Sequence, residues 1–71
     1  MKILVKDLKQ LNRLLVLNGY SKRSFGLVLD VSATTMSQIC NGKRNPSPKV
    51  AKLICDELAV SFDDVFEVVT K

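Results

Sequence analysis

The sequence contains no histidine and no tryptophan, and it has only two cysteines. Without histidine there is no imidazole to act as a general base near neutral pH, and neither Cys40 nor Cys55 has an evident partner that would activate its thiol. Two cysteines also fall short of any zinc-ligand spacing. We therefore expect no enzyme active site, no metal site and no cofactor.

Long hydrophobic runs are also absent. The longest runs, such as residues 14–17, are far shorter than the roughly 18 apolar residues that suggest a membrane-spanning helix. No segment resembles a secretory signal, and both cysteines fall in stretches with helical patterning. These features predict a cytoplasmic, soluble protein with reduced thiols.

The composition that remains is that of one small globular domain spanning residues 1–71, with 46% hydrophobic and 25% charged residues. Eleven Lys and Arg residues against seven Asp and Glu residues give a net charge of +4. The basic residues gather around positions 22–23 and 43–52, whereas four acids lie between positions 56 and 64. This charge is compatible with a polyanionic partner but does not identify one.

Apolar spacing and capping residues predict five helices. The expected segments are about 6–17, 21–29, 32–41 and a fourth helix starting at Pro48, followed by a last one opened by a partial capping box of Ser61 and Asp64. The ends, residues 2–5 and 67–70, have β-branched character. They could pair as strands or add helical turns, and the sequence leaves both possibilities open.

The segment 32–41 has an outward face of small or hydrogen-bonding side chains. If Met36 and Ile39 point to the core, the helical period turns five other residues outward, namely Ala33, Thr34, Ser37, Gln38 and Asn41. No bulky side chain on this face would block close approach to a flat partner. A glutamine amide such as that of Gln38 can pair bidentately with adenine in the major groove of DNA.

Three stretches carry a resemblance to a known family: Val31-Ser32 at the turn, Ile39-x-Asn-Gly-Lys-Arg-Asn-Pro-Ser47, and Leu58-Ala-Val-Ser61 followed by Phe62–Phe66. Together they resemble the lambda-repressor-like, Cro/repressor (XRE-type) helix-turn-helix family of small phage regulators, from Leu8 to Phe66. The resemblance implies an all-α fold of five helices. Helices two and three would form the helix-turn-helix, with the third, about residues 32–41, as the recognition helix in the major groove.

The resemblance and the outward face together predict two sets of DNA contacts. The expected base contacts are Ala33, Thr34, Ser37 and Gln38. Phosphates need only amides, hydroxyls and cations that point toward them, so we expect the phosphate contacts at Lys22, Arg23, Asn41, Lys43 and Arg44.

Several positions depart from the family pattern. Asp30 stands where the family usually has glycine, but aspartate tolerates the left-handed conformation of such a turn. Gly26 replaces a usual alanine and is expected to weaken the second helix by about 1 kcal/mol. Apolar residues occupy positions where the family commonly has polar ones: Leu15, Val16, Leu17, Leu27 and Val28. These either enlarge the core or form an exposed patch for a protein partner.

The sequence thus leads to two hypotheses of function. The first is a transcriptional regulator of Cro or short-repressor type that binds double-stranded DNA as a weak homodimer. The alternative is an antirepressor or modulator that binds a partner repressor protein through an apolar patch of Leu15, Val16, Leu27 and Val28.

Overall fold

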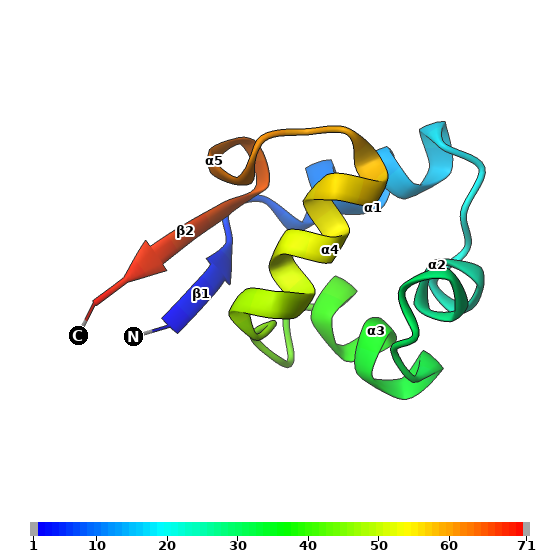
Figure 1. Ribbon diagram of the computed structural model, residues 1–71, viewed down its shortest axis with the longest axis horizontal. Helices are drawn as coiled ribbons and strands as arrows, with labels where there is room; N and C mark the ends of the chain where they lie inside the picture. The colour runs from blue at the N-terminus through cyan, green and yellow to red at the C-terminus, as the bar shows by residue number, and fades with distance from the viewer. Residues whose placement is uncertain (1, 71) are drawn as a thin grey trace.

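The computed structural model describes residues 2–70, which form five helices and two short strands. Their order is β1 (Lys2–Val5), α1 (Leu8–Leu17), α2 (Lys22–Leu29), α3 (Ala33–Cys40), α4 (Pro48–Leu58), α5 (Phe62–Val65) and β2 (Phe66–Val69) (Figure 1). The helical segments therefore form as expected. The all-α prediction is wrong, because the two ends of the chain pair with each other as strands.

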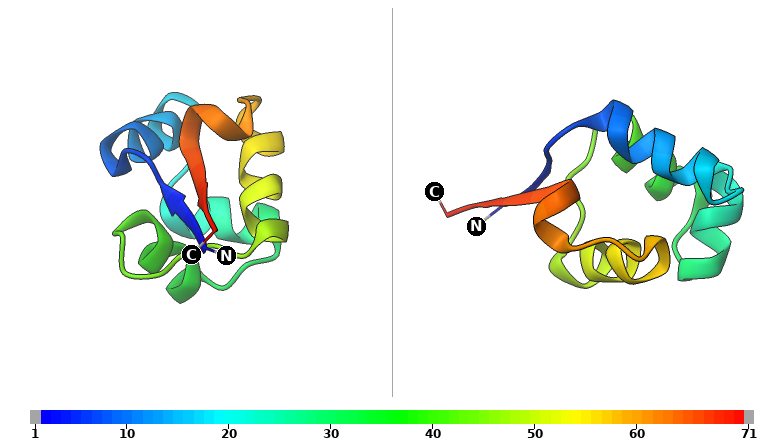
Figure 2. Two further views of the ribbon diagram at one scale, coloured as in Figure 1. Left: turned by 90° about the vertical axis from the view of Figure 1, so that its left-hand side faces the viewer. Right: turned by 90° about the horizontal axis from the view of Figure 1, so that it is seen from above.

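The strands β1 and β2 form an antiparallel ribbon in which Lys2 pairs with Val69 and Val5 with Phe66. Figure 2 shows this ribbon extending from the helices with the two ends of the chain side by side. A two-stranded ribbon is marginal by itself. Here it is anchored because Ile3 and Phe66 are both buried in the core, and because the Lys6 amide donates a hydrogen bond to the Val65 carbonyl at 2.8 Å.

Side-chain caps define where most helices begin. Asp7 accepts hydrogen bonds from the amides of Lys9 and Gln10, so α1 begins at Leu8 and not at residue 6. Ser21, Ser32 and Ser47 cap α2, α3 and α4 in the same way. The expected capping box at Ser61 does not form, since its side chain makes no cap hydrogen bond, and α5 is a single turn of four residues.

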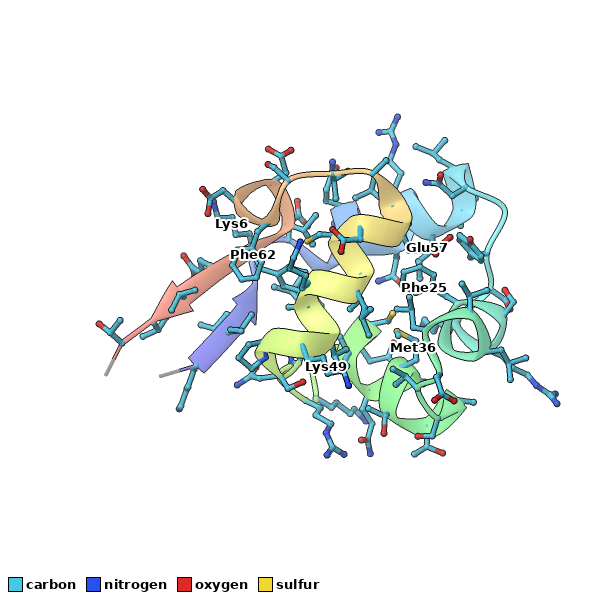
Figure 3. All side chains as sticks on the ribbon, in the orientation of Figure 1. Lys6, Phe25, Met36, Lys49, Glu57 and Phe62 are labelled. Carbon is cyan, nitrogen blue, oxygen red and sulfur yellow. The ribbon has the colours of Figure 1, made fainter. Side chains whose placement is uncertain are left out.

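The core lies between the helices and is closed by the base of the ribbon. Its largest fully buried side chains include Phe25 of α2, Met36 of α3, Ile54 of α4 and Phe66 of β2. Figure 3 shows Phe25 and Met36 lying between α4 and the helices α2 and α3. These contacts hold α3 firmly against the rest of the domain, which leaves its opposite face toward solvent.

A polar contact fixes the connection between α1 and α2. The Tyr20 hydroxyl donates a hydrogen bond to the Glu57 carboxylate of α4 at 2.6 Å, and the Tyr20 ring packs on Phe25 with ring centroids 5.0 Å apart. This hydrogen bond raises the pKa of Tyr20. The start of α2 is thereby tied to α4.

Both cysteines are buried and unbridged, Cys40 at the end of α3 and Cys55 on the inner face of α4. Burial raises the pKa of both thiols, so the thiolate forms are disfavoured. Across residues 2–70, no group of three or more His, Cys, Asp or Glu side chains is arranged to hold a metal ion. In the same part of the chain, no helix has the length and apolar character needed to cross a membrane.

Candidate nucleic-acid interface

The helices α2 and α3 are joined by a tight turn at residues 30–32. Asp30 adopts the left-handed conformation, with φ of 59°, as the sequence predicts for an aspartate at this position. The Val31 amide donates to the Gly26 carbonyl at 2.8 Å, and the Ser32 hydroxyl oxygen accepts from the Thr35 amide at 3.1 Å. The turn therefore ends α2 and starts α3 within three residues.

Gly26 allows this turn to lie close to α2. A Cβ atom at this position would lie 2.8 Å from the Val31 carbonyl oxygen and 3.4 Å from the Met36 Cβ. The first distance is too short for a backbone neighbour, so an alanine would push the turn and α3 away. Gly26 is expected to weaken α2 through its low helix propensity, but it also allows a close packing of the turn that a larger residue would prevent.

The outward face of α3 forms an open hollow. Met36, Ile39 and Cys40 are buried, so the opposite side of the helix faces solvent. The hollow is lined by all four expected base-contact residues and two expected phosphate-contact residues: Ala33, Thr34, Ser37, Gln38, Asn41 and Lys43. The structure thus brings together, on one surface, six of the nine positions selected from the sequence as DNA contacts.

The remaining three predicted phosphate contacts do not line this hollow, although two of them bond to residues that do. Arg44 follows α3, and its Nη1 atom donates a hydrogen bond to Gln38 Oε1 at 3.4 Å. The Lys22 ammonium, from the first turn of α2, donates to Asn41 Oδ1 at 2.7 Å. Arg23 is exposed on α2 next to Lys22. The start of α2 and the end of α3 are therefore directly linked.

The cations at this surface are not neutralised by carboxylates. Between residues 2 and 70, the only ion pair joins Lys52 and Asp56 on α4, at 3.2 Å. Lys22, Lys43 and Arg44 make no such pair within that range. Their positive charge is thus available to an anionic partner.

Asn12 is a positioning residue that sequence reasoning missed. Its Nδ2 atom donates to the carbonyl oxygens of Leu8, at 2.8 Å, and of Cys40, at 3.0 Å. The second bond satisfies a carbonyl at the end of α3, where helix carbonyls lack helical partners. A signal was present in the sequence, because Asn12 shares the apolar face of α1 with Leu8, Leu11 and Leu15, where a polar residue is unexpected.

Gly42 completes the exit from α3. It has a φ of 76°, and a Cβ atom there would lie 2.6 Å from Leu8 Cδ1. Glycine therefore satisfies both the left-handed conformation and the contact with α1. Lys43 and Arg44 follow Gly42 directly, so this contact helps fix the position of the loop that carries them.

The apolar residues singled out on α1 and α2 divide into two groups. Leu15 is only 2% exposed, so its assignment to a surface patch is wrong: it follows Leu11 by one helical turn and packs into the core. Four others are exposed at the C-terminal parts of α1 and α2: Val16 at 74%, Leu17 at 67%, Leu27 at 73% and Val28 at 52%. They do not enlarge the core.

Comparisons with known proteins agree with this architecture. A family model described as a helix-turn-helix matches residues 11–65. No curated protein matches the sequence. Among solved structures, that of the transcriptional regulator VanUg is similar, with a TM-score of 0.69 and 22% identity, covering 100% of this chain and 92% of that chain. At this identity the likeness establishes a common fold. Because the family match runs from α1 through α5 and includes both helices of the motif, the chain belongs to the XRE-type helix-turn-helix family.

Proposed function

We propose that this protein is a sequence-specific DNA-binding transcriptional regulator of Cro or short-repressor type, which inserts α3 into the major groove. The observation that carries the proposal is the open hollow on the outward face of α3. It presents small and hydrogen-bonding side chains, includes the cation of Lys43 in its lining, and contains no acidic residue. Such a surface suits base edges flanked by phosphates.

The side chains that contact the base edges are those of Ala33, Thr34, Ser37 and Gln38. Gln38 is the main candidate, since its amide can donate to adenine N7 and accept from adenine N6 together. The hydrogen bond from Arg44 occupies the Gln38 oxygen before DNA binds. On docking, adenine N6 replaces Arg44 at that oxygen, and Arg44 turns to a phosphate. Thr34 and Ser37 supply hydroxyls, and Ala33 offers only apolar contact.

Affinity comes mainly from phosphate contacts by Lys22, Arg23, Asn41, Lys43 and Arg44. Lys22 lies on the α2 side of the hollow and Arg44 on the side of the following loop. Cations on both sides of α3 match the phosphate chains on both sides of a major groove, which is about 12 Å wide. A monomer of this size makes few contacts, so we propose that a weak homodimer binds paired half-sites.

A second candidate function is favoured by the exposed apolar side chains of α1 and α2. Val16, Leu17, Leu27 and Val28 are more than half exposed in this structure, which is unusual for large apolar residues grouped at two helix ends. A modulator that binds a partner repressor protein would use this surface. DNA contact would then be secondary.

Replacing Leu27 with Glu and Val28 with Lys separates the two candidates, because it removes apolar side chains from the exposed surface of α2. The two changes together leave the net charge unaltered, so non-specific attraction to DNA is kept. Both positions are exposed, so we expect the free energy of unfolding to change by no more than about 0.5 kcal/mol. In gel-shift titrations at low salt, the variant and the wild type should bind duplex DNA with equal monomer affinity and sequence preference. If neither protein binds duplex DNA, and the wild type but not the variant binds a repressor protein, the second candidate is correct.

A further inference from the structure

We propose that the groove between β1 and the loop that follows α3 is an additional DNA-phosphate site, with Lys2 of the terminal ribbon as its second cation. This inference rests on the proposed function and extends the binding surface beyond the helix-turn-helix itself. The polar residues that line the groove are Lys2, Thr35, Arg44, Asn45 and Ser47. They come from three separate parts of the chain, namely β1, α3 and the loop before α4.

The groove lies along one flank of α3. With the helical period, Thr34, Gln38 and Asn41 lie at the middle of the outward face, and Thr35 lies on the flank next to Gln38. Thr35 lines the groove, whereas Ser37, on the other flank, is linked through Asn41 to Lys22 of α2. When α3 occupies a major groove, this flank faces one of the two phosphate chains.

The chemistry of the groove suits an anion. Lys2 and Arg44 supply two cations, and Asn45 and the Ser47 hydroxyl supply uncharged donors. No acidic residue lines the groove, and Lys2 forms no ion pair with any carboxylate in residues 2–70. Beneath these groups the floor is apolar, with Ile39 and Pro46 buried.

The groove is also continuous with the proposed base-contact surface. Arg44 lines the groove and at the same time bonds to Gln38, which lines the hollow on α3. A DNA phosphate chain that runs along this flank would therefore contact Arg44 first and Lys2 farther from the base-contact surface. The pairing of β1 with β2 holds Lys2 in this place, since Ile3 next to it is buried in the core.

The test is the salt dependence of duplex binding by the full chain with Lys2→Gln, compared with Lys6→Gln. Lys6 belongs to the same N-terminal segment and loses the same charge, but its amide bonds to Val65 and it lies beside α5 (Figure 3). The slope of log affinity against log salt is negative, and we expect Lys2→Gln to make it less steep by about one unit, as for one lost phosphate contact. Lys6→Gln should leave the slope unchanged, and Lys2→Arg should keep the wild-type slope.

Each alternative result has a definite meaning. If the wild type binds duplex DNA and Lys2→Gln has the same slope as Lys6→Gln, the groove does not hold a phosphate, although the proposed function stands. A change in base preference with Lys2→Gln would also overturn the inference, because a phosphate contact carries no sequence information. Absence of duplex binding by the wild type overturns both. Lys2 is exposed, so circular dichroism should show equal folding of all variants.

Discussion

Replacing Gln38 with Ala should abolish the preference for one base pair while leaving non-specific affinity nearly intact. Gln38 lies on the outward face of α3 within the hollow and is not part of the buried core that stabilises the fold. Loss of a bidentate pair with adenine should cost about 1 to 3 kcal/mol on the preferred duplex and almost nothing on others. Competition titrations with duplexes altered at one base pair measure this difference.

A second change, made in the DNA, sharpens the test of Gln38. Substituting 7-deazaadenine removes the N7 acceptor from the major groove without altering base pairing. The wild type should lose affinity for this duplex, whereas Gln38→Ala should bind it as well as the unmodified one. Equal loss of affinity by Gln38→Ala on every sequence would show that Gln38 does not recognise a base.

Replacing both Lys43 and Arg44 with Ala should weaken binding to every duplex. These cations lie in the loop after α3, and the close approach of Gly42 to Leu8 helps fix the position of that loop. Two lost phosphate contacts should flatten the slope of log affinity against log salt by up to about two units. The order of preference among sequences should remain, because Gln38 is retained. Titrations at four or more salt concentrations give the slope.

The matched control for this pair is Lys9→Ala with Arg13→Ala, which removes the same charge from exposed positions on α1. Neither residue lines the hollow on α3 or the groove beside it. This control should lower affinity only slightly and keep the slope. An equal change of slope in both double variants would mean that net charge, and not the position of Lys43 and Arg44, governs binding.

Local patterns were sufficient to predict the helices and the surface of α3. Ser32 and Ser47 are caps that act on amides three residues away, so their role is evident within one turn of sequence. The burial of Met36 and Ile39 determines, through the helical period, which neighbours face outward. The residues that line the hollow on α3 therefore follow from the order of amino acids within that one helix.

Features that depend on distant partners could not be predicted in this way. Pairing of Lys2 with Val69 joins opposite ends of the chain, and β-branched residues alone do not reveal their partner. Leu15 lies within four consecutive apolar residues, 14–17, where no single face stands out from the period. The groove beside α3 was missed for the same reason, because Lys2 reaches it only through the ribbon.

Selection of bound duplexes from a random pool by the wild-type chain is the most direct test of the central claim, that α3 recognises a DNA sequence. We expect enrichment of a short motif that contains an A·T pair, and we expect the Gln38→Ala variant to show no preference at that pair. Recovery of duplexes without any enriched motif, at salt concentrations where the protein still binds, would contradict it.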